Sequence, residues 1–311
     1  MAVKWRQKAL LQNIVAKLPR RLSYAAHYYL QRRSGGLRSV DERHRLQTGL
    51  DMIESIHGAG RTVEGATFLE VGTGDHINLP LVLWLAGASG ITTLDLNPYL
   101  RADLVISELA YVRDHREETS RLFQNTPGAV LRPDRVAQLE RMTLRFPSLL
   151  DSLNIRYIAP GDAAHTPLPA GSVDLHISYA VLQHIPQPIL RAILQEAKRL
   201  LRPGGLGIHW VDMSDHFSHG DHSISPVNFL RFSDRAWERL AGNRYMYQNR
   251  LRIDDYIALL GELGGTVRHV NAHVNERALR ALADGLPLDP RFAGKDARTN
   301  ATTNAWITFS F

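Results

Sequence analysis

A short apolar segment that ends at a glycine turn constrains the fold of this chain more than any other feature. Residues 68–71 read Phe-Leu-Glu-Val, the next residues are Gly72, Thr73 and Gly74, and an apolar helical run follows over residues 79–86. A strand that turns sharply into a helix, with no side chain at two positions of the turn, lets a nucleotide-like ligand lie against bare backbone. The pattern therefore predicts an α/β domain with a ligand site at the end of this strand.

The spacing of these glycines and a second acid distinguish between two nucleotide cofactors. A dinucleotide fingerprint requires a third glycine three residues after the second, and this chain has Ile77 at that position. A second apolar strand is predicted over residues 91–94 and closes on Asp95, about 20 residues beyond the turn, where a ribose diol is usually held. A carboxylate there can accept hydrogen bonds from both hydroxyls. The pattern favours S-adenosylmethionine over NAD.

Further strands and helices follow in alternation. Strands are predicted over residues 155–162, 173–179, 206–211, 267–270 and 305–311, and helices over residues 189–201 and 253–263. The third strand ends in Gly161 and Asp162, and the carboxylate of Asp162 suits an adenine amino group. The first of these helices stops at the Pro-Gly-Gly breaker of residues 203–205.

The order of these segments resembles the class I S-adenosylmethionine-dependent methyltransferases. The matching positions are residues 70–74, Asp95, and residues 161–163, 178–184 and 200–205. The resemblance implies an α/β fold with a Rossmann-like, seven-stranded, mostly parallel sheet, helices on both faces, an N-terminal helical arm and a helical insertion. It also implies S-adenosyl-L-methionine as the cofactor and S-adenosyl-L-homocysteine as the product. A generic nucleotide-binding α/β domain is the alternative, because any single turn and acid can arise by coincidence.

The resemblance assigns the cofactor contacts residue by residue. Glu70 would orient the amino end of the cofactor, Asp95 would hold the ribose, and Asp162 would hold the adenine. The glycines would allow the backbone to approach closely. The implied cofactor-binding residues are Glu70, Gly72, Thr73, Gly74, Asp95, Leu96, Asp162, Ala163, Ser178 and Tyr179.

A narrower resemblance extends over nearly the whole chain. Residues 28–37, 215–230 and 247–252 look like bacterial methyltransferases that are encoded with enzymes of polysaccharide or natural-product biosynthesis. This resemblance implies O-methylation of a hydroxyl on a sugar or small metabolite. The expected partner is therefore a small-molecule or glycosyl acceptor, and no DNA is expected.

Histidines and acids are concentrated directly after the fifth strand. This segment contains Asp215, His216, His219, Asp221 and His222, and in a fold of this kind it would face the methyl group of the cofactor. A positioned general base typically adds about 10²–10⁴-fold to the rate when the acceptor is a hydroxyl. Histidine suits the task because its unperturbed pKa is about 6.5.

Four residues are the candidates for the base. His219 is the first choice, followed by His216, Asp221 and His184, which ends the fourth strand region. The alternatives are a divalent metal held by the histidines and a structural role in which they satisfy backbone groups of a long loop. For His184, packing or capping at a strand-to-helix junction is the stronger alternative. A metal-independent site is the prediction.

Composition narrows the remaining classes. The chain has 311 residues and no cysteine, which excludes disulfides, thiolate metal sites and a cysteine nucleophile. Its longest apolar stretch, over residues 79–88, is too short to span a bilayer. The first residues lack the apolar core of a secretory signal. A cytoplasmic location is expected.

The first 40 residues are strongly basic. They contain nine of the 37 lysines and arginines and none of the 31 acids, so the rest of the chain carries about −3. Leu11, Ile14, Val15 and Leu18 recur at helical spacing and predict a basic amphipathic helix that ends near Pro19. A cap packed on the catalytic domain, a contact with a membrane surface, and a dock for an anionic substrate are the open readings of this arm.

The chain divides into a cap and a catalytic domain. A basic helical cap is predicted over residues 1–60, and the methyltransferase domain over residues 61–311. The domain carries a helical insertion over residues 101–150 and a polar one over residues 212–252. The oligomeric state stays open.

Other functions agree less well with the sequence. Methyltransferases of nucleic-acid amino groups have an Asn/Asp-Pro-Pro-aromatic run after strand four, and this chain has Ser178 and Tyr179 there. The basic arm leaves an RNA methyltransferase as an alternative. A small-molecule N-methyltransferase and a non-catalytic cofactor-binding protein are the others.

Overall fold

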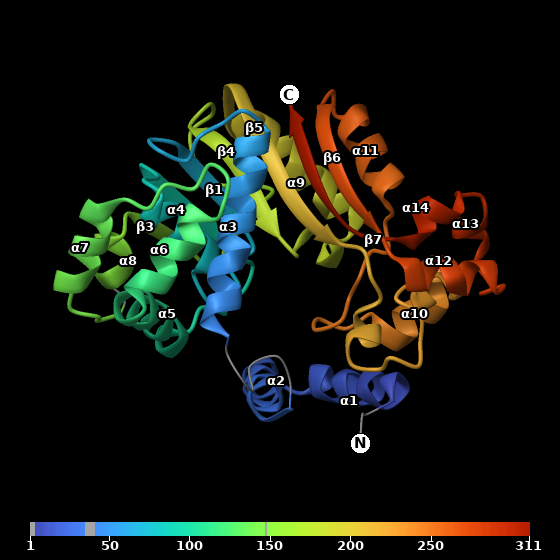
Figure 1. Ribbon diagram of the computed structural model, residues 1–311. Helices are drawn as coiled ribbons and strands as arrows, with labels where there is room; N and C mark the ends of the chain where they lie inside the picture. Colours follow the sequence, from blue (N-terminus) through green and yellow to red (C-terminus); the bar gives the residue numbers. More distant parts are fainter. Residues whose placement is uncertain (1–3, 35–40, 147) are drawn as a thin grey trace.

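The central sheet explains why the glycine turn and the strand-end acids meet. The computed structural model describes residues 4–34, 41–146 and 148–311 (Figure 1). The strands are β1 Thr67–Val71, β2 Gly90–Leu94, β3 Ile155–Ile158, β4 Val173–Tyr179, β5 Leu201–Asp212, β6 Thr266–Val274 and β7 Thr302–Ser310. They form one seven-stranded sheet in the order β3-β2-β1-β4-β5-β7-β6.

The helices are distributed between and around these strands. The α-helices are α1 Trp5–Lys17, α2 Arg20–Ser34, α3 Glu42–Gly58, α4 Asn78–Leu85, α5 Ala102–Asp114, α6 Arg116–Gln124, α7 Pro133–Arg141, α8 Ser148–Ser152, α9 Gln187–Leu200, α10 Asp234–Ala241, α11 Ile253–Glu262, α12 Glu276–Ala283, α13 Pro290–Ala293 and α14 Ala297–Ala301. Three short 3₁₀ helices are η1 Leu182–His184, η2 His216–His219 and η3 Asn228–Arg231. None of the helices in the described ranges is both long and apolar enough to cross a membrane.

The pairing of the strands confirms the predicted α/β fold with its mostly parallel sheet. Strands β1 to β5 pair with one another in parallel, and β7 runs antiparallel to both β5 and β6. Strand order reverses between β1 and β4. In open α/β sheets, ligands bind outside the carboxyl ends of the strands at such a point of reversal. The glycine turn follows β1 at this point.

Alternate residues of β1 face the two sides of the sheet. Phe68 packs into the core formed with α3 and α4, whereas Leu69 and Val71 pack into the core on the side of α9. Side chains of a strand point alternately to opposite faces, and a parallel sheet buries both of them. Because both faces of β1 are packed, the position of the strand within the sheet is fixed, and with it the position of the turn that follows.

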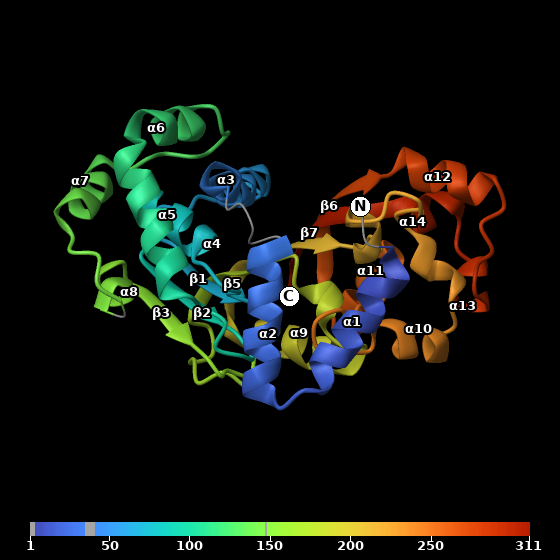
Figure 2. The ribbon, with the colours of Figure 1, turned by 90° about the horizontal axis from the view of Figure 1, so that it is seen from below.

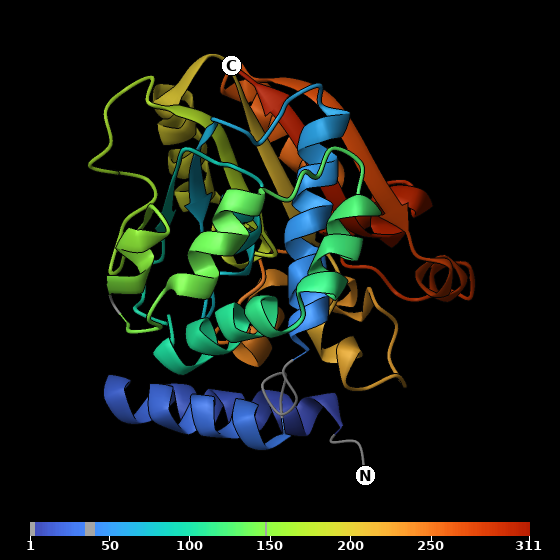
Figure 3. The ribbon, with the colours of Figure 1, turned by 60° about the vertical axis from the view of Figure 1, so that its left-hand side comes forward.

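The insertion between β2 and β3 enlarges the first of these two cores. Its helices α5, α6 and α7 contact α3 and α4, and Figure 3 shows them outside those helices. Val105, Leu109 and Phe123 are buried in this contact. The insertion predicted over residues 101–150 is therefore helical and contributes to the core.

The segment after α9 differs from the predicted pattern. Strand β5 begins at Leu201, directly after α9, and not at Leu206. Val173 pairs with Leu201 and Leu175 pairs with Leu206, so the residues between them interrupt the register. Gly204, with a φ of +78°, lies in this interruption. The breaker sequence therefore produces an irregularity within β5, because the flanking residues still pair with β4.

The cap predicted over residues 1–60 has two parts in the structure. Helix α3 follows its N-cap residue Asp41, whose side chain accepts a hydrogen bond from the His44 amide. Leu50 and Ile53 of α3 lie in the main core. Helices α1 and α2 instead lie across the carboxyl end of the sheet (Figures 1 and 2). Only these two helices form a separate layer over the domain.

A second core joins α1 to the segment that follows β5. Trp5 and Ala9 of α1 pack with Phe217, Trp237 and Phe292. The ring centroids of Trp5 and Phe217 are 5.6 Å apart, within the range of favourable aromatic pairs. Residues 212–252 are therefore held between the sheet and the N-terminal helix.

Candidate active site

The glycine turn after β1 has the backbone that a closely bound ligand requires. Gly72 and Gly74 have φ angles of +87° and +69°, which residues with a side chain rarely adopt. A Cβ atom on Gly72 would come 2.4 Å from Cγ2 of Val181, whereas a Cβ atom on Gly74 would meet no described atom within 4 Å. Packing therefore fixes Gly72, and Gly74 borders open space.

Replacement of Gly72 by alanine is expected to weaken S-adenosylmethionine binding by about tenfold or more and to lower the melting temperature. The added methyl group would strain the backbone and clash with Val181, and each effect costs on the order of 1–3 kcal/mol. Titration calorimetry and thermal unfolding measure the two losses. Gly285→Ala is the matched control, because Gly285 has a φ of +84° and open space at its Cβ position. Equal losses in both variants would contradict the role given to the Val181 contact.

Asp95 joins the end of β2 to the glycine turn. One carboxylate oxygen accepts from the Gly74 amide at 3.1 Å, and the other accepts from the Asn97 amide at 2.9 Å. Burial raises the pKa of Asp95, and these two backbone hydrogen bonds partly offset that effect. The side chain is therefore fixed next to Gly74. Leu96, the next residue, is 68% exposed, so its apolar side chain is accessible to a ligand.

Glu70 is buried beneath the same turn. Its carboxyl accepts a hydrogen bond from the Thr93 hydroxyl, and the Thr93 and Thr73 hydroxyl oxygens are 2.6 Å apart. Burial raises the pKa of Glu70 to about 8, so the group is largely protonated at neutral pH. In this structure Glu70 and Thr73 support the turn from below. The direct contact of Glu70 with the amino end of the cofactor stays a prediction.

Asp162 lies in the loop that follows β3. Its carboxylate accepts from the Ala164 amide at 2.8 Å and lies 3.0 Å from Nδ1 of His165. The hydrogen bond to His165 is the main cause of its lowered pKa. Asp162 is therefore ionised and exposed, as an acceptor for an amino group should be. Ala163 beside it is buried.

The two candidates at the end of β4 differ in where their side chains lie. The Ser178 hydroxyl is buried in the sheet and lies 2.7 Å from Nδ1 of His209, so only its backbone can reach a ligand. Tyr179 stacks on Trp210, with ring centroids 4.4 Å apart. The next residue, Ala180, has a φ of +57°, which brings Val181 under Gly72.

These residues fit the adenosyl part of S-adenosylmethionine. The fit rests on Gly74, whose missing Cβ leaves open space, and on Asp95, whose carboxylate is anchored beside it. Two carboxylate oxygens offer about four acceptor sites in all, and the two backbone amides leave sites for a diol. The residues that would hold the cofactor are therefore grouped at the carboxyl ends of β1 and β2.

The histidine cluster after β5 is organised by an acid that the sequence analysis did not select. Asp212 is the last residue of β5. Its Oδ2 atom lies 3.2 Å from Nε2 of His216 and 3.8 Å from Nε2 of His219. Burial alone would raise the pKa of Asp212, but the hydrogen bonds from His216 and Ser214 outweigh that effect and lower it. Asp212 is therefore ionised.

A hydrogen-bond chain fixes the proton of the His219 ring. The Ser214 hydroxyl donates to Oδ1 of Asp212 at 2.6 Å and lies 2.8 Å from Nε2 of His219. Because a hydroxyl has one proton, its oxygen must accept from His219, so Nε2 carries the hydrogen. Nδ1 is then the nitrogen that can accept a proton. The His219 side chain is 54% exposed.

His184 approaches this cluster from the segment after β4. Its ring centroid is 5.0 Å from that of His216, which is in turn 5.1 Å from that of His219. Its Nδ1 atom lies 2.7 Å from the Tyr247 carbonyl, so Nδ1 donates and Nε2 is the acceptor. His184 is solvent-accessible, yet desolvation lowers its pKa to about 4.

Segment 247–252 holds the cluster in place. The Gln248 side chain donates to the Ser214 carbonyl at 2.8 Å and accepts from the His216 amide at 3.3 Å. Arg252, fully buried, donates to the Met213 carbonyl at 2.7 Å. The motifs over residues 215–230 and 247–252 therefore meet at one site.

The two remaining acids of the segment have other partners. The Asp221 carboxylate accepts from the Trp5 amide at 2.9 Å and from the Ser223 hydroxyl. It thus lies at the first residue of α1, where a helix favours negative charge. Asp215 is fully buried and accepts from the Phe217 amide, and burial raises its pKa to about 6. The structure brings together His184, His216 and His219, and it binds Asp221 to the cap.

Helix α2 of the cap contacts the loop that follows β2 and Asp95. The Tyr24 hydroxyl donates to Oδ1 of Asn97 at 2.8 Å, and the Tyr24 ring packs edge-on against Tyr99. Asn97 lies two residues after Asp95. The hydroxyls of Ser23 and Tyr245 are 2.6 Å apart. Helix α2 is therefore in contact with the loops on both sides of the site, a feature that the sequence analysis did not predict.

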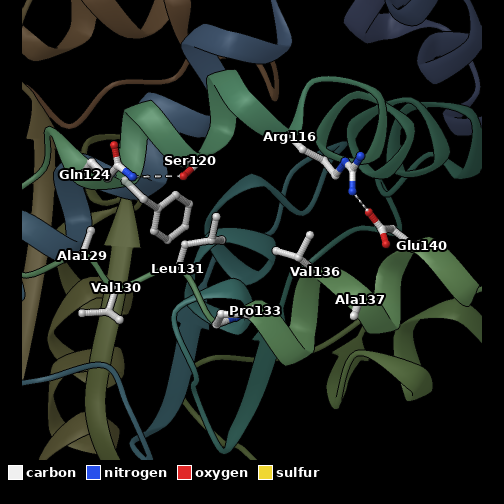
Figure 4. A pocket seen from close by; sticks show the side chains of 11 residues that line it. Arg116, Ser120, Gln124, Ala129, Val130, Leu131, Pro133, Val136, Ala137 and Glu140 are labelled. Atoms are coloured by element: carbon white, nitrogen blue, oxygen red, sulfur yellow. Dashed lines mark hydrogen bonds and ion pairs between the residues drawn. The ribbon is translucent and has the colours of Figure 1, made fainter.

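Two pockets lie outside the cofactor residues. One, of about 540 Å³, lies in the insertion, and Figure 4 shows Arg116 facing Glu140 at one end and Gln124 beside Ser120 at the other. No cofactor or histidine candidate lines it. The other, of about 460 Å³, adjoins His184, and its lining includes Pro186, Asp234, Trp237, Tyr247, Asn249 and Arg291. Among the residues that the structure describes, no three histidine, aspartate or glutamate side chains are arranged to hold a metal ion.

Comparison with known proteins matches part of the chain to a family. Residues 136–208, from α7 into β5, match the family model described as a methyltransferase domain. No curated protein matches the chain. A solved S-adenosylmethionine-dependent methyltransferase from Mesorhizobium loti is similar, with 15% identity, 84% of this chain and 99% of the other covered, and a TM-score of 0.45. Magnesium protoporphyrin IX methyltransferase from Synechocystis PCC 6803, solved with bound S-adenosylhomocysteine, has 14% identity, coverage of 86% and 84%, and a TM-score of 0.43.

Proposed function

We propose that this class I S-adenosylmethionine-dependent methyltransferase methylates a hydroxyl of a sugar or small natural-product metabolite, with His219 as the general base. The hydrogen-bond chain from His219 through Ser214 to Asp212 is the observation that carries the proposal. When the His219 ring is neutral, this chain assigns the hydrogen to Nε2 and leaves Nδ1 as the acceptor nitrogen. An amine acceptor would not need such a base, because a neutral amine can attack unassisted.

The proposed base has the charge state that the reaction requires. Bound S-adenosylmethionine supplies a methyl group on a positively charged sulfur. Nδ1 of His219 would take the hydroxyl proton as the acceptor oxygen bonds to that methyl carbon and the carbon–sulfur bond breaks, which would release S-adenosylhomocysteine. Desolvation lowers the pKa of His219, and the Asp212 charge partly offsets that effect. His219 is therefore neutral at pH 7 before transfer, and Asp212 stabilises the imidazolium that forms.

The cofactor contacts in this proposal are those that the sequence assigns. Asp95 would hold the ribose, Asp162 the adenine and Glu70 the amino end, with Gly72 and Gly74 in backbone contact. The anchored carboxylate of Asp95 supports its role. His184 and His216 would line the acceptor position beside the base, which their ring distances support.

The polar pocket beside His184 supports a hydroxyl-rich acceptor. Its lining includes Asp234, Arg291 and Tyr247, and the Asp234 side chain is 70% exposed. Carboxylate, guanidinium and phenol groups are suitable hydrogen-bond partners for the hydroxyls of a sugar ring. The pocket begins next to the bond between His184 and Tyr247, so it would receive the part of the acceptor beyond the reacting hydroxyl.

Methyl transfer to a panel of sugars and small metabolites tests the acceptor class. The assay follows labelled methyl groups from S-adenosylmethionine, and each active hydroxyl compound is compared with its deoxy and amino analogues. Transfer to the hydroxyl compound and not to the deoxy analogue is expected. Because removal of His219 should spare only an acceptor that needs no base, the His219→Ala variant should methylate amino analogues alone. Transfer restricted to amines in the wild type would overturn the proposal.

A further inference from the structure

The outward face of the cap carries an unusual share of the exposed apolar side chains. Ten large apolar side chains are exposed in the described residues, and six of them belong to the cap: Leu10, Leu11, Ile14, Leu18, Leu22 and Tyr29. Leu10 is 63% exposed and Leu22 is 61% exposed. The cap accounts for a small part of the chain, so this concentration is specific to its surface.

Helix α1 uses a different face for packing than its apolar spacing suggests. Trp5, Ala9, Gln12 and Val15 are its buried residues, and Trp5 and Ala9 join the second core. Of the apolar residues that predict an amphipathic helix, only Val15 is buried. Leu11, Ile14 and Leu18 are exposed. The helix is therefore apolar on the domain side and apolar again on the solvent side.

The exposed apolar residues of α1 form one stripe. At about 100° per residue, Leu10, Leu11 and Ile14 fall within about a third of the helix circumference, and Leu18 continues the stripe one turn later. We define the cap face as Leu10, Leu11, Ile14, Leu18 and Leu22. Arg6 and Lys17 are exposed and fall beside this stripe on the same helical spacing, so basic side chains border one edge of it.

The charge of the cap distinguishes it from the rest of the protein. Nine basic residues and no acids occur among the first 40 residues, and the remainder carries about −3. A surface of anionic lipid would attract the cap and repel the rest, which sets one orientation. Basic amphipathic helices with leucine on the opposite side lie in the interface plane of such membranes.

We propose that the cap face docks on the surface of an anionic lipid membrane. Leu10, Leu11, Ile14, Leu18 and Leu22 enter the boundary between head groups and acyl chains, and Arg6 and Lys17 remain at the level of the head groups. Both charge and exposed apolar side chains contribute, as stable attachment without a spanning helix requires. The proposal does not depend on the nature of the methyl acceptor.

Docking would bring the candidate active site to the membrane. Figures 1 and 3 show α1 and α2 lying beneath the carboxyl end of the sheet, where Tyr24 contacts Asn97 and α1 contacts η2. The face that would meet lipid is the outer side of this same layer. An acceptor attached to lipid would therefore meet the site close to the interface.

Co-sedimentation of the full chain with lipid vesicles tests the proposal. Vesicles of pure phosphatidylcholine are compared with vesicles in which phosphatidylglycerol replaces about a third of the lipid. Binding to the anionic vesicles is expected to be about tenfold stronger and to decline as salt is added, because salt screens the charges. Leu11→Gln with Ile14→Gln should reduce binding by about tenfold, and Lys17→Gln should reduce it for anionic vesicles only.

Matched substitutions on other surfaces serve as controls. Ile257→Gln replaces an apolar side chain that is 40% exposed on α11, and Arg156→Gln removes an exposed charge on β3. Neither should change vesicle binding, and circular dichroism verifies that all variants fold. Equal binding to both vesicle types, or equal behaviour of cap and control variants, would overturn the proposal. A wild-type oligomer that the Leu11 and Ile14 substitutions dissociate, without vesicle binding, would assign the cap face to protein contact instead.

Discussion

Replacement of Asp95 by alanine is expected to weaken the binding of S-adenosylmethionine and S-adenosylhomocysteine by about two orders of magnitude. Hydrogen bonds to a charged group each contribute about 1.5–3 kcal/mol, and the ribose would lose two of them. The variant also loses the link between β2 and the Gly74 amide. Titration calorimetry with both ligands measures the loss.

Two further variants separate binding from folding. Asp95→Asn retains an acceptor oxygen for one backbone amide, so it should fold like the wild type and still bind about tenfold more weakly. Asp134→Ala removes an exposed carboxylate on α7 and should bind normally. Wild-type protein that is folded but binds neither ligand would contradict the cofactor assignment itself. Unchanged affinity in Asp95→Ala would contradict only the ribose contact.

Replacement of His219 by alanine is expected to lower kcat by about 10²–10⁴-fold and to leave cofactor affinity unchanged. The factor is the typical contribution of a positioned base, and His219 lies outside the residues that would hold the cofactor. Steady-state kinetics with a hydroxyl acceptor and calorimetry with S-adenosylmethionine measure the two quantities. His269→Ala, on the exposed strand β6, is the control. Full activity in His219→Ala together with inactivity in His216→Ala would move the base to His216.

The pH profile provides a second readout of the same base. A base must be neutral to accept a proton, so activity is present above its pKa and lost as pH falls through it. Desolvation places the pKa of His219 below its ordinary 6.5, so the acid limb should lie below pH 6.5. In Asp212→Asn the nearby negative charge is lost and the limb should move to still lower pH. An acid limb above pH 6.5 in the wild type would argue against His219.

Local patterns were sufficient to predict the sheet and the edge at which the glycine turn and Asp95 meet. Strands β1 and β2 are short apolar runs that end in an acid or a glycine, and the carboxyl ends of parallel strands meet at one edge. The positions of Gly72, Gly74 and Asp95 follow from this rule. The same rule would have identified Asp212, which also closes an apolar strand, had it been applied to β5 as it was to β2.

Contacts between distant segments could not be predicted from local patterns. The carboxylate of Asp221 is beside two histidines in sequence, but its partner is the amide of Trp5. Side chains of β4 point alternately to the two faces of the sheet. The side chain at position 178 is on the face where it contacts His209 of β5 and is buried. Helices α12, α13 and α14 were not predicted. Their packing in the second core depends on residues far away, such as Trp5 and Phe217.

The face that α1 buries illustrates the same difficulty. An apolar period of a helix indicates that one face is covered, but it does not indicate by what. Here Trp5 and Ala9 meet Phe217 across more than 200 residues of intervening chain, and this contact decides the orientation of the helix. Leu11 and Ile14 consequently face outward.

The tautomer of His184 is set by the backbone carbonyl of Tyr247, and Tyr247 is also among the residues that line the polar pocket. Exchange of Tyr247 for another residue would change the shape and polarity of that pocket and leave the ring proton of His184 where it is. Under the proposed function, acceptor preference and proton placement are thus separable traits at one position. Related enzymes could diverge in substrate through residue 247 without rebuilding the histidine cluster, and position 247 is accordingly a suitable target for directed evolution of acceptor range.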